Sequence, residues 1–307
     1  MKKVVVTGGA GFIGSHLSDK LAESDYQVII LDDLSTGKME NIELLIKRDN
    51  VKFVKGSITD LTMLKEVLHG VQYVFHLAAI ASVPRSISDP QLSHEVNTSG
   101  TLRVLLAAKD SGVSKVIYSS SSAVYGDTPT LPQREDMPPS PQSPYAVSKL
   151  TGEYYCRVFQ QVYSLPAVCL RYFNVYGPRQ DPDSQYAAVI PKFIKMISQG
   201  RPPVIYGDGS QTRDFIFVKD AVAANILAAE SESTGVFNIG AGNSISISEL
   251  ALLITRLMGS NLTLVHKPAR PGDIMHSLAD ISQAEAFGFR PKYILAKGLE
   301  ETIKETK

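Results

Sequence analysis

Short apolar runs alternate with longer amphipathic stretches along most of the chain. The apolar runs lie at 4–6, 27–31, 51–54, 73–77, 115–118 and 236–239. Short, predominantly apolar runs are typical of strands that a parallel sheet buries on both faces. Between them, 61–68 and 218–229 have the periodicity of helices. The alternation predicts an α/β fold with a doubly wound parallel sheet.

Other stretches predict further elements. We expect helices over about 39–48, 91–111 and 144–163, and an extended segment over 203–206. Ser246 and Glu249 form a capping-box pattern, which predicts a helix from there to about Met258. The proline-rich passage 129–144 cannot form regular structure, because proline has no backbone donor.

A glycine-rich loop follows the first apolar run. After Val4–Val6 and Thr7 the chain reads Gly8-Gly9-Ala10-Gly11-Phe12-Ile13-Gly14, which fits G-x-x-G-x-x-G from Gly8 and G-x-G-x-x-G from Gly9. Glycines let the backbone approach a pyrophosphate closely, and the N-terminus of the following helix favours an anion. A strand before the loop and a helix after it make this a predicted dinucleotide site on a Rossmann sheet.

The second apolar run ends in Asp32 and Asp33. Asp32 stands 18 positions beyond Gly14, close to where the dinucleotide fold places the acid that binds the adenosine ribose. Its carboxylate would repel the 2′-phosphate of NADP, and no arginine follows it closely, so we expect NAD. The turn after it could lie along the adenosine, and the small residues Ala78, Ala79 and Ala81 leave room for a cofactor at a strand end.

Composition narrows the possible partners. The 307 residues include 31 basic and 31 acidic side chains, so no global field recruits nucleic acid or an anionic membrane. No apolar run reaches membrane-spanning length and the N-terminus has no secretory pattern, so we expect a soluble cytoplasmic protein. Cys156 and Cys169 are expected to be buried free thiols. The six histidines show no metal-ligand spacing, and no metal site is expected.

Candidate chemistry lies at the end of the run 115–118 and in the helix after it. The run leads into a serine cluster, Ser119 to Ser122, where an α/β sheet collects active-site groups. Tyr145 and Lys149 are four residues apart, so they share one helical face. The ammonium and a cationic nicotinamide should lower the pKa of the tyrosine and make tyrosinate available as a base.

These residues resemble the extended short-chain dehydrogenase/reductase family, through 7–14, Asp32, Ser121 and Tyr145-x-x-x-Lys149. Further motifs at 170–180, 213–215 and 270–273 are similar to its nucleotide-sugar branch. In that branch, dehydratases carry an Asp-Glu pair and UDP-glucuronate decarboxylases a Glu after the catalytic Ser/Thr. Here that segment reads Ser122-Ala123-Val124-Tyr125, without a carboxylate.

The resemblance therefore implies a UDP-hexose 4-epimerase. The segments 180–182 and 186–191 are similar to the subgroup that acts on N-acetylated sugars, so UDP-GlcNAc/UDP-GalNAc and UDP-glucose/UDP-galactose are the expected pairs. A UDP-glucuronate or UDP-N-acetylhexosaminuronate 4-epimerase is the alternative. A catalytically silent NAD-binding regulator is a remote one, which the intact Ser121, Tyr145 and Lys149 disfavour.

The implied chemistry removes a hydride from sugar C4 to NAD while Tyr145 takes the hydroxyl proton, giving a 4-keto intermediate. Ser121, Tyr145 and Lys149 are the implied catalytic residues. The implied cofactor site comprises Gly8, Gly11, Phe12, Ile13, Gly14, Asp32, Asp33, Ser35, Thr36, Gly37, Ser57, Ile58, Leu77, Ala78, Ala79, Ala81, Asn97, Ser119, Tyr145, Lys149, Tyr172, Asn174 and Val175. The implied substrate site comprises Ala81, Ser82, Arg85, Ser121, Ser122, Tyr145, Asn174, Gln180, Ala188, Val189, Val204, Tyr206, Arg213, Arg270, Asp273 and Ser277.

The resemblance also implies an organisation of the chain. Residues 1–173, with a returning segment at about 214–240, would form the NAD-binding Rossmann domain, and 174–213 with 241–307 a smaller interleaved α/β lobe for the UDP-sugar. The helices at 91–111 and 144–163 correspond to those that pair in family dimers, so a homodimer with a four-helix interface is expected. Ser277 stands where related epimerases that exclude acetylated sugars carry tyrosine, so we expect it to leave space for an acetamido group; its alternative is an ordinary solvated loop serine.

Overall fold

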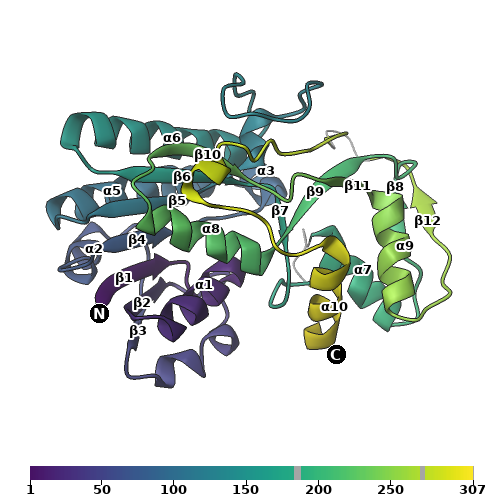
Figure 1. The fold of residues 1–307 in the computed structure, drawn as a ribbon, viewed down its shortest axis with the longest axis horizontal. Coiled ribbons are helices and arrows are strands. Elements are labelled where there is room, and N and C mark those ends of the chain that lie inside the picture. Colours follow the sequence, from purple (N-terminus) through teal and green to yellow (C-terminus); the bar gives the residue numbers. More distant parts are fainter. Residues whose placement is uncertain (183–187, 270–273, 307) are drawn as a thin grey trace.

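The computed structural model describes residues 1–182, 188–269 and 274–306. Within them the large sheet has seven strands in the order β10-β6-β5-β4-β1-β2-β3, all paired in parallel (Figure 1). Their bounds are β1 (Lys2–Thr7), β2 (Tyr26–Asp32), β3 (Val51–Lys55), β4 (Tyr73–His76), β5 (Lys115–Ser121), β6 (Ala167–Tyr172) and β10 (Gly235–Ile239). The predicted doubly wound fold is confirmed.

Helices cover both faces of this sheet. On one face α1 (Phe12–Glu23) packs beside α8 (Val218–Glu230), and the other carries α2 (Leu61–Val67), α5 (Gly100–Asp110) and α6 (Pro144–Tyr163). Successive strand residues point to opposite faces, so Val4 and Val6 join the core under α1 and α8, whereas Val5 joins the core under α2 and α5. Burial on both faces explains why these strands are apolar throughout.

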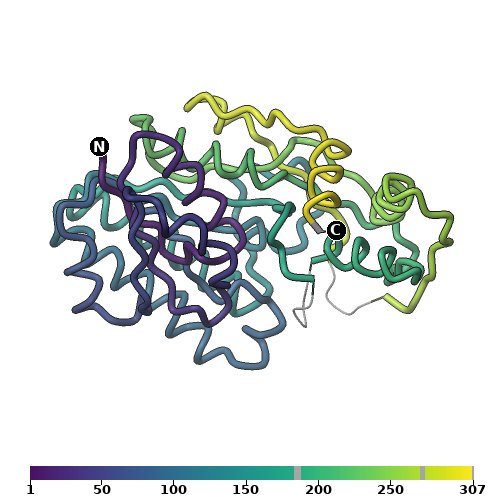
Figure 2. The backbone as a smooth tube through the Cα atoms, turned by 90° about the horizontal axis from the view of Figure 1, so that it is seen from below, coloured from purple at the N-terminus to yellow at the C-terminus, as the bar shows by residue number. Residues whose placement is uncertain are grey.

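A smaller lobe follows β6, at the right of Figure 1 and separated from the purple N-terminal end in Figure 2. Its described strands form a sheet of order β11-β9-β7 and a pair β12-β8. The elements are β7 (Asn174–Tyr176), α7 (Val189–Ser198), β8 (Val204–Tyr206), β9 (Thr212–Phe217), β11 (Ser244–Ser246), α9 (Ile247–Leu257), β12 (Val265–Lys267) and α10 (Leu295–Thr306). A separate apolar core joins them, with Phe193, Leu250 and Leu299 among its members.

The chain crosses between the two parts more than once. After β6 it enters the small lobe, and with α8 and β10 it returns to the large sheet. Segment 214–217, which we expected in the returning segment, belongs to β9 and pairs with β7 and β11 instead. The division into two functional domains stays a prediction.

Two predicted helices differ in detail. The stretch 39–48 contains only two 3-10 turns, Met39–Asn41 and Leu45–Lys47, because Lys38 N and Asn41 Nδ2 both donate to Ala10 O and fix the chain against the glycine loop. The stretch 91–111 consists of α4 (Pro90–Ser93), a π-helical turn (His94–Ser99) and α5. The π turn contains the buried Asn97, and π-helical turns often occur at functional sites.

Other local predictions agree with the structure. The capping box of Ser246 and Glu249 opens α9, and β8 covers the predicted extended segment. Cys156 and Cys169 are buried free thiols. The short helix α3 (Val83–Ser88) and the 3-10 turns Ser122–Tyr125 and Ala284–Phe287 complete the named elements. Over the described ranges, we find no helix with the length and apolar content to span a membrane.

Candidate active site

The glycine loop passes close to the neighbouring strand end. Gly8 has φ +69°, and a Cβ placed there would lie 2.7 Å from Ala78 N, just after β4. A Cβ at Gly14 would lie 2.1 Å from Gly8 O. Gly11 caps α1 without a side chain, so the first N–H groups of the helix stay uncovered by a capping group. This narrow, donor-rich backbone suits a pyrophosphate.

Asp32 ends β2 beside this loop and is only 7% exposed. Its Oδ2 accepts from Ala10 N at 3.0 Å and its Oδ1 from Leu34 N at 2.8 Å. Gly37 covers the carboxylate so closely that a Cβ there would lie 2.7 Å from Oδ1. Asp33 is exposed and accepts from Ser35 N. Each Asp32 oxygen keeps a second lone pair for a ligand hydroxyl.

A buried polar chain lies under the cofactor side of the sheet. The ring of His76 contacts Thr7 Oγ1 at 2.8 Å and Thr101 Oγ1 at 2.9 Å. Thr7 Oγ1 also accepts from Ala78 N, and Thr101 donates to Asn97 O. Burial, and then the charge of Lys149, lower the pKa of His76 to about 3, so this imidazole stays neutral at physiological pH.

The catalytic candidates meet at the carboxyl end of β5. Ser143 caps α6 by accepting from Ala146 N, and Tyr145 lies in the first turn, where its backbone N donates to Ser86 Oγ of α3. The Ser121 side chain lies close enough to the Tyr145 phenol to lower its pKa. One turn later the Lys149 ammonium lies 5.9 Å from the centre of the Tyr145 ring. The structure therefore brings Ser121, Tyr145 and Lys149 together.

The electrostatics of this cluster bear on the expectation that Lys149 and a cationic nicotinamide together lower the pKa of Tyr145. Burial raises the pKa of Tyr145, and the neighbouring Ser121 side chain lowers it by less. Lys149 was expected to lower it, but its own environment is dry, and burial lowers the pKa of Lys149 to about 8 while Glu153 opposes the shift. Lys149 Nζ donates to Ser119 O at 2.7 Å. The protein groups alone thus do not provide tyrosinate, because the desolvation of the phenol outweighs its polar contacts.

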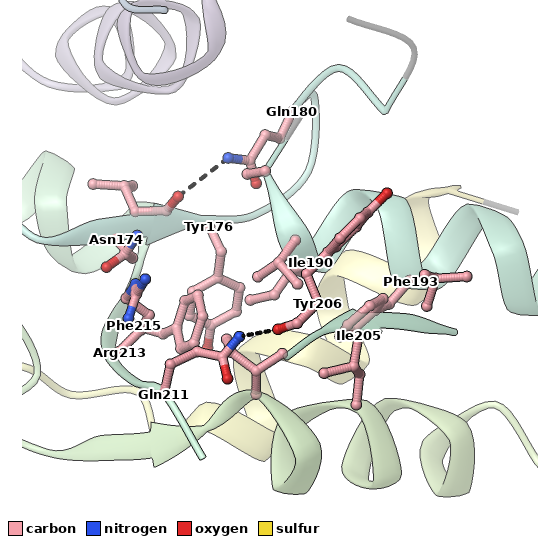
Figure 3. A pocket seen from close by; sticks show the side chains of 15 residues that line it. Asn174, Tyr176, Gln180, Ile190, Phe193, Ile205, Tyr206, Gln211, Arg213 and Phe215 are labelled. Carbon is pink, nitrogen blue, oxygen red and sulfur yellow. Dashed lines mark hydrogen bonds between the residues drawn. The ribbon is translucent and has the colours of Figure 1, made fainter. Parts of the chain in front are cut away.

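A cavity of about 230 Å³ opens in the small lobe (Figure 3). Seven predicted substrate residues line it, together with Val175 from the predicted cofactor set: Asn174, Gln180, Ala188, Val189, Val204, Tyr206 and Arg213. Gln180 donates to Val175 O, and Gln211 donates to Tyr206 O at 2.8 Å. Gln180 Oε1 has no partner within the described residues, so an acceptor is available to a ligand.

Sequence reasoning missed several lining residues. Gln211 and Phe215 alternate with Arg213 along the chain and line the same cavity. The two-residue period of a strand was the signal that could have found them. Ile190 and Phe193, from the apolar face of α7, contribute the hydrophobic wall.

The segment that carries Ser277 lies against the start of β9. Ser277 N donates to Thr212 O at 3.2 Å, and the Arg213 guanidinium donates to Thr212 O and Met275 O. Ser277 is 5% exposed, so the alternative of a solvated serine is excluded. It is not among the residues that line the 230 Å³ cavity, and its proximity to the sugar stays a prediction.

A buried carboxylate holds this part of the small lobe. Asp214, with no exposed surface, accepts from Ala241 N at 2.7 Å, Gly242 N at 3.0 Å and Ala279 N at 3.1 Å. Burial raises its pKa to about 6 against these three bonds. Asp214 therefore fixes two loops around the strand that carries Arg213.

Five further predicted residues fall in three groups. Ser82 caps α3 by accepting from Arg85 N, and α3 contacts the start of α6, where Tyr145 N donates to Ser86 Oγ. Asn97 uses its amide on Ile80 O, Ile80 N and Ser148 Oγ, so it holds the loop after β4 to α6. Arg270 and Asp273 lie outside the described residues.

Fold and site together define a protein of the short-chain dehydrogenase/reductase class: the glycine loop, Asp32 and the Ser121–Tyr145–Lys149 cluster surround one end of a Rossmann sheet. Within that class, residues 4–240 match the NAD dependent epimerase/dehydratase family, and the chain belongs to this family. The resemblance found in the sequence is confirmed, and so is its expectation of an NAD-dependent epimerase.

Individual relatives cover nearly the whole chain. The UDP-glucose 4-epimerase of Mycolicibacterium smegmatis is 40% identical over 306 residues, 98% of this chain and 97% of that protein. A UDP-N-acetylglucosamine 4-epimerase from Methanobrevibacter ruminantium, in complex with UDP-N-acetylmuramic acid, is 47% identical with a TM-score of 0.97, covering 99% and 98% of the two chains. A UDP-glucose 4-epimerase from Thermus thermophilus, in complex with NAD, is 37% identical with a TM-score of 0.90, over 99% and 98%.

Proposed function

We propose that this protein interconverts UDP-hexoses that differ at C4, as a UDP-sugar 4-epimerase. The observation that carries the proposal is the cluster of Ser121 and Tyr145 with Lys149 one turn away, at the same sheet end as the glycine loop. The names of the relatives support it, since they are epimerases of UDP-glucose and of UDP-N-acetylglucosamine.

The residues of the cofactor side fit NAD. The glycine backbone at Gly8 and Gly14 leaves no room for a side chain and suits the pyrophosphate, and the Asp32 carboxylate would bind the adenosine ribose. Lys149 would bind the nicotinamide ribose. When bound, NAD supplies the hydride acceptor for sugar C4 and returns the hydride to the opposite face.

The three side chains of the cluster have separate roles in the transfer of the 4-hydroxyl proton. Ser121 donates a hydrogen bond to the sugar 4-oxygen and orients it. The Tyr145 phenolate takes the 4-hydroxyl proton and later returns it. Because burial alone raises the pKa of Tyr145, the phenolate depends on positive charge beside it, which Lys149 supplies in its protonated form.

The small lobe would hold the nucleotide while the sugar turns over. Arg213 projects into the cavity (Figure 3), where its planar guanidinium suits phosphate oxygens, and Arg270 is proposed as its companion. The segment Ser122–Tyr125 offers no carboxylate for dehydration or decarboxylation. UDP-GlcNAc/UDP-GalNAc and UDP-glucose/UDP-galactose are the proposed pairs.

Incubation of the purified protein with each UDP-sugar, followed by chromatographic separation of the C4 epimers, tests the function. We expect both pairs to equilibrate without net conversion of added NAD. Equilibration of UDP-glucuronate alone would favour the uronate alternative. Stoichiometric reduction of NAD would identify a dehydrogenase, and inertness toward all UDP-sugars would favour the regulator.

The proposal also covers the assembly and location of the protein. Val147, Tyr154 and Val158 of α6 are 43–50% exposed and lie seven and four residues apart, which forms an apolar stripe on this helix. A second copy that covers the stripe would give the homodimer through α5 and α6, and sedimentation would detect it. A cytoplasmic location, without nucleic acid or membrane partners, remains part of the proposal.

A further inference from the structure

Three successive residues of β5 lie against three residues of α6 that are four positions apart. The Ser121 side chain lies near the Tyr145 phenol, Ser119 O accepts from Lys149 Nζ, and Ser120 Oγ donates to Glu153. The first two pairs belong to the proposed catalytic cluster. The third pair continues the same helical face one turn further and reaches neither the cofactor loop nor the cavity of the small lobe.

Glu153 is 3% exposed and is held on its other side by Arg171 of β6. Arg171 Nε donates to Oε1 at 2.9 Å and Nη2 to Oε2 at 2.7 Å, a bidentate pair. The guanidinium carbon lies 4.7 Å from the centre of the Tyr125 ring, in the turn that follows Ser121. Carboxylate and guanidinium thus tie α6, β5 and β6 together directly beneath the catalytic cluster.

Stability does not account for this pair. Two ions lose their hydration on burial, and well-packed apolar residues in their place are often as stabilising or more so. A buried pair at this point therefore suggests a use for its charge or its geometry.

The nearest use is Lys149, one turn before Glu153. The groups around its ammonium are the ring of Tyr118 at 5.1 Å, the ring of Tyr145 at 5.9 Å, the neutral His76 and Glu153. The thiols of Cys156 and Cys169 and the Arg171 guanidinium lie further along the same helix–strand contact. Of these groups, Glu153 is the one that favours the charged ammonium, against a burial that lowers the pKa of Lys149 to about 8.

We propose that Glu153 is a positioning residue for the epimerase reaction, which sets the register of α6 on β5 and keeps Lys149 protonated beside Tyr145. The inference rests on the proposed roles of Tyr145 and Lys149. Arg171 in turn fixes the Glu153 carboxylate, so that it can act on Lys149 without turning toward it.

The decisive variant is Glu153→Gln, which keeps the shape and removes the charge. The titration of Lys149 is followed by NMR in protein labelled with ¹³C at the lysine ε carbon, and Lys149→Arg assigns the signal. We expect Lys149 in the variant to lose its proton at a lower pH than in the wild type. The alkaline limb of the pH profile of kcat should also move to lower pH. At a pH above this limb, kcat should be about tenfold lower for each pH unit of the shift, while KM changes little.

Three further variants keep the test decisive. Glu153→Asp retains the charge and should leave the Lys149 titration near the wild-type pH, even if the Ser120 contact weakens. The double variant Glu153→Gln/Arg171→Gln leaves no unpaired buried ion, so it answers the question if the single variant does not fold. Glu95→Gln removes one carboxylate from an exposed pair with Arg103 and should change neither readout.

An unchanged Lys149 titration and an unchanged alkaline limb in a folded Glu153→Gln or double variant would overturn the proposal. The pH at which Lys149 loses its proton could also fall as far in Glu153→Asp as in Glu153→Gln. That result would overturn the role of the charge. The NMR readout needs no turnover, so a wild type that epimerises nothing would refute the proposed function and still leave the titration measurable.

Discussion

The two halves of the site are held by buried carboxylates in different ways. Asp32, on the cofactor side, accepts from Ala10 and Leu34, 22 and 2 residues away, inside one strand–loop–helix–strand unit. Asp214, on the sugar side, accepts from Ala241, Gly242 and Ala279, 27, 28 and 65 residues away. The carboxylate of the cofactor half is therefore held within one local unit, whereas the carboxylate of the sugar half is held only when distant segments meet. We therefore expect a substitution in the first half to affect mainly its own loop, and a substitution in the second half to affect several segments.

The largest effect is expected at Tyr145, whose hydroxyl lies between the two halves and is proposed to take the substrate proton. Tyr145→Phe deletes one hydroxyl and keeps the ring that packs at the start of α6. Loss of the proton-transfer group should lower kcat by about 10²–10⁴-fold, with NAD affinity nearly unchanged in a calorimetric titration. Near-normal turnover would remove Tyr145 from the mechanism.

The next largest effect concerns the sugar half. Ser277→Tyr places a ring where the buried serine packs beside Thr212. Overpacking costs roughly 1–3 kcal/mol, so kcat/KM for the acetylated pair should fall about 5- to 150-fold more than for UDP-glucose and UDP-galactose. Ser277→Ala is the control, and both pairs should keep their rates. Equal losses on both pairs in steady-state kinetics would refute a gate for the acetamido group.

The cofactor half should respond more narrowly. Asp32→Ala removes the acceptor for the adenosine ribose and the repulsion of a 2′-phosphate, so NAD affinity should fall by roughly tenfold while NADP loses less. Asp25→Ala, at an exposed aspartate just before the opposite end of β2, serves as the control and should change neither affinity much. Direct binding titrations with both nucleotides decide it, and equal losses for NAD and NADP in Asp32→Ala would contradict the assignment.

The smallest expected effect is on stability. The pKa of Asp214 is about 6 in the folded protein against 3.8 for an ordinary aspartate. The folded protein therefore binds the Asp214 proton more tightly than the unfolded chain does. The stability that this proton contributes is fully present below pH 3.8 and is lost as pH rises through 6. Asp214→Asn lacks the titration, so its free energy of unfolding relative to wild type should rise between pH 4 and pH 7. Chemical denaturation at both pH values measures this, and a pH-independent difference would contradict it.

How much the sequence could predict follows the same division. The glycine loop and Asp32 fall in one contiguous unit, and Tyr145 and Lys149 share one helix face, so local pattern and spacing were sufficient for them. The partners of His76, Glu153 and Asp214 come from segments that only tertiary packing brings near. The effect of burial on the Tyr145 pKa could not be predicted for the same reason, because desolvation depends on packing that no spacing reveals.

The order of the large sheet has a consequence for synthesis on the ribosome. β6, which carries Arg171, is paired on its outer side by β10, and the chain runs through β7, α7, β8, β9 and α8 between Tyr172 and Ile239. At 5–20 residues per second, those 67 residues take about 3–13 s to translate. For that time the nascent sheet presents the bare edge of β6, an open template for pairing with another chain. A chaperone that shields this edge would protect the growing chain from such pairing.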